Sequence, residues 1–352
     1  MLASPSGRAG LHRERAPGTF SSVVVLPIPR RMSVVLSRPT PSARADAHSV
    51  ACRLVDAVAT VMAGRREQIE VLTACTLAGG HLLIEDLPGV GKTLMAQSAA
   101  AAIGGSFSRV QGTSDLLPAD VVGSLAPNAE GLGLHFRPGP VFANIVLFDE
   151  LNRANPRTQS ALLEVMEEGS VTVDGAGHAV PDPFMVVATQ NPVEMAGTYP
   201  LAEGVTDRFM AAISLGRADE DEEVEVLTGR RGRGRLGAVD AVVTTADVVG
   251  ARLATQAIHL AEPVARYAVG ILRATREHPR IRIGASTRAG VSMVALARAF
   301  ALMDDRDHVA PHDVDRAVQC SLAHRVVLAS HERGAAAEVV AECLASVPAP
   351  RR

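Results

Sequence analysis

Hydrophobic positions between residues 51 and 216 alternate between helical spacing and short unbroken runs. Apolar residues recur at helical spacing over 54–62 and 69–77, and Gly79-Gly80 ends the second of these stretches. Unbroken apolar runs are typical of strands in a parallel sheet that is covered on both faces. This alternation predicts an α/β doubly wound sheet. Strands are expected over 81–85, 106–110, 145–148 and 183–188, and helices over 94–103 and 155–168.

The pattern changes after Leu215, where only helical periodicity remains. We therefore predict two domains, an α/β core over 48–216 and a helical domain over 217–352. Two segments interrupt the core, a Gly- and Pro-rich excursion at the sheet edge over 112–140 and a small hairpin over 171–180. Helices of the second domain are expected over 220–227, 246–254, 264–276, 288–302 and 314–328.

Residues 1–47 differ from the rest of the chain. They hold seven arginines against only Glu14 and Asp46, with several Ser and Pro and no helical period. A transit peptide has a similar composition, rich in Arg and Ser and poor in acids. The alternative that we favour is a disordered tail or an over-extended gene start, with Met32 or a nearby codon as the true beginning.

Composition narrows the class of protein. The 352 residues are 47% hydrophobic, with a net charge of −3 and few aromatic side chains, which argues against a protein that wraps nucleic acid. The four cysteines are scattered without a Cys-x-x-Cys, so a reducing, cytoplasmic location is expected. No apolar run reaches the ~18 residues that a membrane span needs.

Lys92 is the only lysine, and the other 34 basic residues are arginines. It lies between a predicted strand and a predicted helix, where a compact ammonium can bind the β- and γ-phosphates of ATP. Backbone N–H groups would hold the phosphates, and the Thr93 hydroxyl would bind Mg²⁺. The strict phosphate-loop pattern has Gly where this chain has Asp86. The expected nucleotide-binding residues are Asp86, Leu87, Pro88, Gly89, Val90, Gly91, Lys92, Thr93 and Leu94.

Asp149 and Glu150 follow a buried strand, at the end where open α/β sheets bind ligands. Asp149 is expected to orient a water on Mg²⁺, and Glu150 to act as the base for the attacking water. Two acids at a strand end are often merely solvated, but the phosphate loop upstream favours the catalytic interpretation. Asn191 ends the next strand and is expected to hold that water without adding charge.

Arg208 and Arg288 are candidates for neutralising charge on the transferred phosphoryl group, an effect worth ~10³–10⁵ in rate. Spacing alone cannot select them among so many arginines. Two further patterns have simpler explanations. The Arg/Gly-rich segment 230–235 suits a flexible connector better than a nucleic-acid patch, and acids at a helix N-terminus explain His308 and His312 near Asp313 better than a metal site.

Taken together, five blocks of sequence resemble the MoxR family of AAA+ ATPases, over about residues 50–335. The resemblance implies a P-loop AAA+ core followed by an all-α lid domain. By this resemblance Asn191 is the sensor 1 residue, Arg208 the arginine finger that acts on the neighbouring subunit, and Arg288 the sensor 2 residue. Residues 112–137 correspond to the helix 2 insert, and 170–182 to the pre-sensor 1 insert. The blocks are 85–93, 139–144, 149–154, 188–192 and 197–201.

One stretch departs from the family pattern. The family usually has Leu-Pro-Glu-Ala-Gln-Leu before Asp-Arg-Phe, and this chain has Leu201-Ala202-Glu203-Gly204-Val205-Thr206. The resemblance further implies an ATP hydrolase that forms a homo-oligomeric ring, expected as a hexamer. It would act as a chaperone on partner complexes, with a von Willebrand factor A domain protein as partner and no nucleic acid. The alternatives are a nucleic-acid motor and a nucleotide-gated scaffold.

Overall fold

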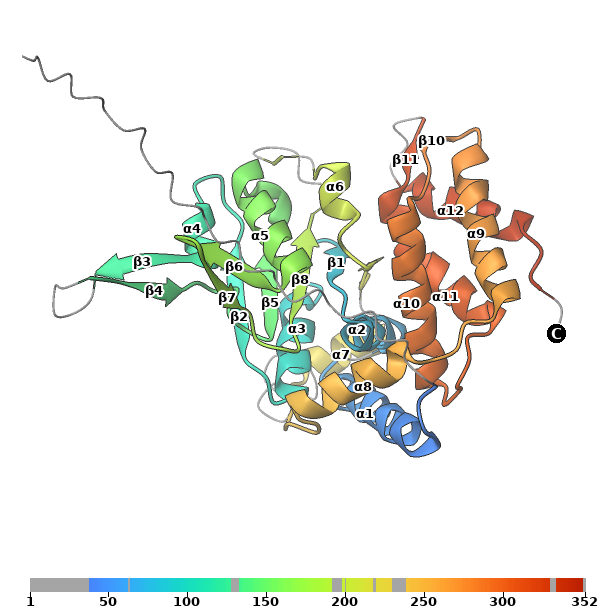
Figure 1. The fold of residues 1–352 in the computed structure, drawn as a ribbon, viewed down its shortest axis with the longest axis horizontal. Helices are drawn as coiled ribbons and strands as arrows, with labels where there is room; N and C mark the ends of the chain where they lie inside the picture. The colour runs from blue at the N-terminus through green and yellow to red at the C-terminus, as the bar shows by residue number, and fades with distance from the viewer. Residues whose placement is uncertain are drawn as a thin grey trace, which may run out of the picture. The chain divides into compact units, whose positions relative to one another are not determined.

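A five-stranded parallel sheet forms the centre of the fold (Figure 1). The computed structural model describes residues 38–62, 64–127, 133–191, 198–199, 201–217, 220–229, 239–329 and 334–350. The sheet has the order β2-β5-β8-β1-β9, so β8 lies between β5 and β1. Its strands are β1 (Leu82–Glu85), β2 (Phe107–Gln111), β5 (Ile145–Asp149), β8 (Met185–Gln190) and β9 (Ala211–Ile213).

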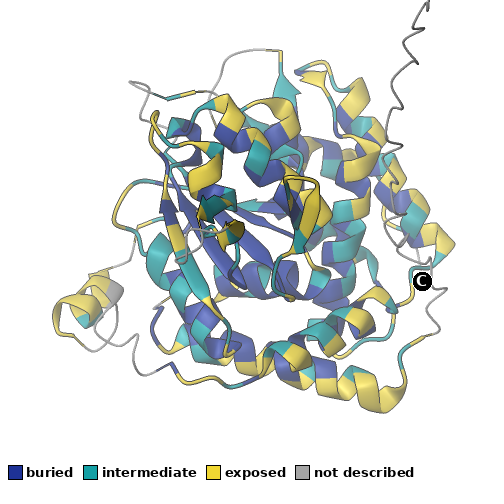
Figure 2. Ribbon diagram, turned by 60° about the vertical axis from the view of Figure 1, so that its left-hand side comes forward, coloured by how far each residue is buried: buried dark blue, intermediate teal, exposed yellow. Residues whose placement is uncertain are grey.

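Both faces of the sheet are buried, as the unbroken apolar runs predict (Figure 2). Successive strand residues point to opposite faces. Ile145 and Leu147 therefore join the apolar core with α1 (Pro41–Ala59), α2 (Arg66–Ala78) and α3 (Lys92–Ala102). Val146 and Phe148 join a second core that includes α5 (Pro156–Glu168).

The helix predicted over 155–168 is confirmed as α5. The Asn155 side chain accepts hydrogen bonds from the N–H groups of Arg157 and Thr158, both at 3.1 Å, and Pro156 takes the first helical position. The helix ends at Gly169, which has a φ of 64°. The C-terminal end of α5 lies close to the start of β1, because His81 Nε2 lies 3.1 Å from the carbonyl oxygen of Met166.

The boundary predicted at residue 47 is wrong, because α1 begins at Pro41. Thr40 caps this helix by accepting a hydrogen bond from the Ala43 N–H at 3.2 Å. Ala47 is buried, and Arg44 forms an ion pair with Asp305 at 3.0 Å. A proline at the first helical position after a threonine is a start signal that the charge pattern of this segment obscured.

Removing residues 1–37 is expected to leave folding and ATPase activity unchanged, because that sequence has no core-forming periodicity. Removing residues 1–47 is expected to destabilise the protein, because it deletes the cap and the first turns of α1. Loss of the cap alone costs about 1 kcal/mol, and the melting temperature should fall by several degrees. Thermal unfolding of both truncated proteins tests this, and equal melting temperatures would contradict it.

Two hairpins extend from the core. The 112–140 excursion contains α4 (Pro118–Val122) and the antiparallel strands β3 (Gly123–Pro127) and β4 (Leu134–Pro138), and the predicted 171–180 hairpin is β6 (Ser170–Val173) with β7 (Ala176–Ala179). Phe136 of β4 stacks on His178 of β7 with ring centroids 3.9 Å apart. This stack joins the two hairpins to each other.

The C-terminal part is mostly helical, as predicted, with one helix shorter than expected. The helix expected to reach residue 328 ends at Ser321, because residues 327–328 form β11, which pairs antiparallel with β10 (Ile281–Ile283). Its helices are α7 (Glu220–Leu227), α8 (Thr245–Gln256), α9 (Glu262–Glu277), α10 (Thr287–Met303), α11 (Pro311–Ser321) and α12 (Ala335–Ser346).

Helices α8 and α10 pack directly on the core. α8 contacts α1 and α2, and α10 contacts α2 (Figure 1). Among the described residues, no helix has the length and apolar character to cross a bilayer. The Arg/Gly-rich segment 230–235 lies outside the described residues.

Candidate nucleotide-binding site

The loop predicted to bind phosphate connects β1 to α3. Gly89 and Gly91 have φ angles of 89° and 99°, in the left-handed region that favours glycine. Gly91 is also the residue before α3 and has no side chain with which to cap it. The first N–H groups of α3 and the positive end of its dipole therefore face the loop, which suits an anion.

Lys92, the first residue of α3, lies over this loop. Its Nζ donates a hydrogen bond to the Asp86 carbonyl oxygen at 2.5 Å. Burial lowers the pKa of Lys92, and the negative charges of Asp86, Asp149 and Glu150 oppose that shift. The ammonium is thus held close to the acids that were predicted to share its site.

The neighbours of Lys92 divide into exposed and packed residues. Pro88 is exposed and Thr93 is half-buried beside Lys92 on α3. The side chains of Val90 and Leu94 pack against the apolar core. Val90 and Leu94 therefore anchor the loop and the first turn of α3 to the core.

Asp86 has a role that its place in the predicted motif did not indicate. Its carboxylate accepts hydrogen bonds from the Ser214 hydroxyl at 3.0 Å and from the backbone N–H groups of Leu215 and Gly216 at 2.6 and 2.8 Å. The Leu87 N–H donates to the other oxygen at 2.9 Å. Burial raises the pKa of Asp86, but these hydrogen bonds outweigh burial and hold the pKa below its usual value. The carboxylate is therefore committed to residues 214–216 and to the Leu87 N–H, and is not available to a nucleotide.

Asp149 is buried at the end of β5 and is hydrogen-bonded from two neighbouring strands. The Arg109 Nε from β2 donates to Asp149 Oδ2 at 2.6 Å, and the Thr189 hydroxyl from β8 donates to Oδ1 at 3.2 Å. These contacts orient the carboxylate at the carboxyl edge of the sheet.

Glu150 has an unusual backbone conformation for a non-glycine residue, with φ 56° and ψ 52°. Its N–H donates to the Thr189 hydroxyl oxygen at 2.9 Å. Its Oε2 accepts hydrogen bonds from Gln111 Nε2 at 2.9 Å and Arg153 Nη1 at 3.2 Å. Strain of this kind persists only when neighbours hold it, and it clusters at functional sites.

Asn191 follows β8 directly. The Asp86 N–H donates to the carbonyl oxygen of Gln190 at 3.1 Å, which places Asn191 next to the start of the phosphate loop. Residues 192–197 lie outside the described residues. Asp149 ends β5, and Lys92, Glu150 and Asn191 follow the ends of the adjacent parallel strands β1, β5 and β8.

Arg208 and Arg288 lie together, at the opposite end of the sheet. Both line a cavity of about 310 Å³ together with Gly80 and His81, which precede β1, whereas the phosphate loop follows β1. The Met210 N–H also donates to the His81 carbonyl oxygen at 2.8 Å. Neither arginine is therefore placed to reach the phosphate loop of its own chain.

The stretch that departs from the family pattern makes a hydrogen bond with Arg208. Residues Glu203–Thr206 form the short helix α6, and the carbonyl oxygen of Gly204 accepts a hydrogen bond from Arg208 Nη1. The departure from the family pattern therefore still leaves a backbone acceptor that orients Arg208.

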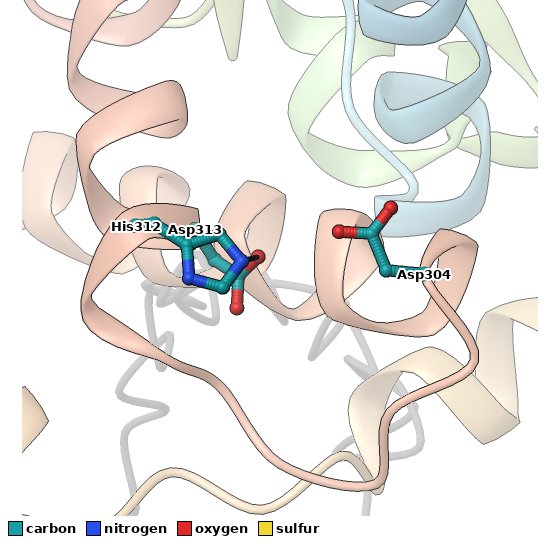
Figure 3. Close-up of side chains that lie close together, drawn as sticks. All are labelled: Asp304, His312 and Asp313. Atoms are coloured by element: carbon teal, nitrogen blue, oxygen red, sulfur yellow. Dashed lines mark ion pairs between the residues drawn. The ribbon is translucent and has the colours of Figure 1, made fainter. Parts of the chain in front are cut away.

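Asp304, His312 and Asp313 lie close together, with ligand atoms within 4.8 Å of one another (Figure 3). Arg306 donates hydrogen bonds to both oxygens of Asp313 and to Asp304 at 2.8 Å. Asp313 also accepts from the Ala310 N–H at 2.7 Å, before α11. Arg306 thus pairs with both carboxylates, and Asp313 is an acid in the first turn of α11, as expected from the sequence.

Four residues beside the predicted site residues escaped the sequence analysis. Arg109 and Gln111 alternate along β2, which pairs with β5, so a prediction of strand pairing would have found them. Thr189 lies within the block 188–192, which resembles the MoxR family, but no role was predicted for it. No sequence signal distinguishes Glu167 from the other acids of α5. The four residues without a predicted role are Arg109, Gln111, Glu167 and Thr189.

Known proteins are similar to this chain over most of its length. Residues 81–211 match the ATPase family associated with various cellular activities (AAA), and residues 273–343 match the AAA lid domain. The chain is 41% identical to YeaC of Bacillus subtilis over 308 residues, covering 87% of this chain and 96% of YeaC. It is 36% identical to the chaperone MoxR1 of Mycobacterium tuberculosis over 299 residues, covering 81% and 77%.

A crystal structure of a candidate ATPase from Cytophaga hutchinsonii is 33% identical, with a TM-score of 0.79 over 88% of this chain and 98% of that one. The parallel sheet flanked by helices and the helical part after it match the architecture expected from the resemblance. From the fold, the sequence identity and the extent of the match, this chain belongs to the MoxR family of AAA+ ATPases.

Proposed function

We propose that this chain binds ATP with Mg²⁺ and hydrolyses the bond to the terminal phosphate. One observation carries the proposal: the phosphate loop, the Asp149–Glu150 pair and Asn191 follow the carboxyl ends of the adjacent strands β1, β5 and β8. In open α/β sheets this edge binds ligands. An ammonium, two carboxylates and an amide at one edge suit phosphoryl transfer better than binding alone.

The residues present fit both ATP and Mg²⁺. Gly89 has open space where a side chain would lie, which leaves room for a phosphate oxygen against the backbone, and Lys92 supplies the positive charge. The Thr93 hydroxyl and the Asp149 carboxylate are oxygen donors of the kind that Mg²⁺ prefers. When bound, Mg²⁺ would neutralise charge on the β- and γ-phosphate oxygens.

Glu150 is the proposed base for the attacking water. As water attacks the terminal phosphorus, its proton would pass to the Glu150 carboxylate, and the bond to the ADP oxygen would break. Asn191 would orient that water. Gln111 and Arg153 donate hydrogen bonds to Glu150 Oε2, so they fix the position of the carboxylate.

We further propose that hydrolysis requires a neighbouring protomer. The placement of Arg208 and Arg288 beside residues that precede β1 supports this, because the phosphate loop of the same chain follows β1. Each arginine would then stabilise charge on ATP bound by the adjacent subunit. A homo-oligomeric ring, as a hexamer, satisfies this arrangement at every interface.

The biological role that we propose is chaperone-like activation of partner complexes in the cytoplasm, with a von Willebrand factor A domain protein as partner. The name of the chaperone MoxR1, 36% identical to this chain, supports this role. A nucleic-acid motor and a nucleotide-gated scaffold are the alternatives. The net charge of −3 disfavours the motor, and Glu150 disfavours the scaffold. Stimulation of the ATPase rate by DNA would favour the motor.

Lys92→Ala is expected to lose ATP binding and, with it, hydrolysis, because the phosphate charge would go uncompensated. Affinity for a fluorescent ATP analogue should fall at least tenfold, a loss of about 1.4 kcal/mol or more. Thermal unfolding checks that the variant is folded. A folded Lys92→Ala protein that hydrolyses ATP at the unchanged rate would refute the assignment of the site.

A further inference from the structure

Glu167 joins the two arginines through one carboxylate. This residue lies in the last turn of α5, and its Oε2 accepts a hydrogen bond from Arg208 Nη2 at 3.0 Å. Its Oε1 accepts a second hydrogen bond from Arg288 Nη2. Arg208 comes from the core and Arg288 from α10, so the carboxylate also links α5 to the lid.

The lid holds the segment around Arg208 at further points. The Arg325 Nη2 donates to the carbonyl oxygens of Asp207 at 3.0 Å and Phe209 at 2.8 Å. The hydroxyl of Ser286, two residues before Arg288, lies 3.4 Å from both oxygens of the Asp207 carboxylate. The backbone on both sides of Arg208 is therefore fixed relative to the start of α10.

The charges at this cluster require an acid. Two guanidinium groups that share one cavity repel each other, and a single carboxylate between them offsets that repulsion. Hydrogen bonds from Arg288 and Arg208 hold the pKa of Glu167 below its usual value, so it stays charged near neutral pH.

The cluster is open enough to exchange partners. The side chains of Arg208, Glu167 and Arg288 are 25%, 34% and 48% exposed. Ion pairs with this exposure are weak, because water screens them. An incoming phosphate, with more charge than a carboxylate, can therefore compete for the same N–H groups.

We propose that Glu167 is a positioning residue that holds Arg208 and Arg288 as a pair, so that both meet the terminal phosphate of ATP bound by the neighbouring protomer. This inference rests on the proposed function. Without the carboxylate the two guanidinium groups separate, and the phosphate meets one of them or neither. The effect falls on the rate of hydrolysis and spares binding at the phosphate loop, which lies at the other end of β1.

Glu167→Gln tests this, because it keeps the size of the side chain and removes its charge. We expect kcat to fall on the order of tenfold or more, since small misplacement of a charge-stabilising group is costly, while KM for ATP stays within about twofold. Glu168→Gln changes the adjacent exposed acid and is expected to leave both constants unchanged. A Glu167→Gln protein with the unchanged kcat, or a higher one, overturns the proposal.

Mixed rings distinguish positioning from a structural role. Arg208→Ala protomers are mixed with Glu150→Gln protomers, so that only the second kind can donate Arg208 to an intact Glu150. Adding Glu167→Gln to the Glu150→Gln protomer is expected to reduce the recovered activity, and adding it to the Arg208→Ala protomer is expected to have no effect.

An equal loss from either side overturns this inference and leaves the ATPase assignment standing. Failure of the parent mixture to recover any activity, with co-assembly verified, overturns both the action across the interface and the positioning role. Glu167→Asp provides a second variant, since a shorter carboxylate should restore part of the kcat that Glu167→Gln loses.

Discussion

Glu150→Gln is expected to bind ATP as tightly as the unchanged protein and to hydrolyse it at least tenfold more slowly, since a positioned base contributes roughly 10²–10⁴-fold. The amide has nearly the same shape but cannot accept the proton of the attacking water. Gln111 and Arg153 can still donate to its carbonyl oxygen, so the backbone around residue 150 should remain in place. Phosphate release under saturating ATP measures the effect.

The matched control for this experiment is Glu164→Gln, which removes an exposed carboxylate of α5. It is expected to leave turnover unchanged. ATP affinity is measured separately, because the prediction is a loss of rate without a loss of binding. Turnover of Glu150→Gln at the unchanged rate would mean that another group accepts the proton.

Arg208→Ala is expected to bind ATP almost normally and to lose most hydrolysis, because an arginine finger contributes ~10³–10⁵ in rate. Binding is spared because Arg208 lies beside Gly80 and His81, which precede β1, whereas the phosphate loop of its own chain follows β1. Single-turnover hydrolysis at saturating ATP measures the loss without interference from binding. Melting temperature should change little, since the ion pair that Arg208 makes with Glu167 is partly exposed.

Mixing Arg208→Ala protomers with Glu150→Gln protomers is the sharper form of this test. Neither variant is active alone, but an interface between them can combine an intact Glu150 with an intact Arg208. Activity should therefore reappear and pass through a maximum as the mixing ratio changes. An arginine that acts within its own chain predicts no recovery at any ratio.

The core of the fold could be predicted because its local signals agree with one another. The run 145–148 is apolar without interruption, and the structure buries it on both faces as β5. Asn155-Pro156 marks the start of α5 correctly, and Lys92 stands in the strand–loop–helix context that its motif requires. In each case residues close in sequence carry the information.

Partners that are distant in sequence could not be predicted. Asp86 matched the position of a motif glycine, but its carboxylate binds residues 214–216, and only the folded chain brings them together. Glu167 meets Arg208 across 41 residues and Arg288 across 121. The start of helix α1 was missed although its signal is local. The arginines of residues 1–47 outweighed the start signal at Thr40-Pro41.

The single strand β1 has a further consequence for assembly. The strand has only four residues. Its carboxyl end leads into the loop before Lys92, and the cavity lined by Arg208 and Arg288 lies at its other end. If the two ends are the two halves of one active site, each protomer presents unlike surfaces, and contacts between protomers are heterologous. A symmetric pair of protomers, in which like surfaces face each other, would complete no site at all. An open chain of protomers would leave one site at its end without arginines, and only closure of the chain completes every site.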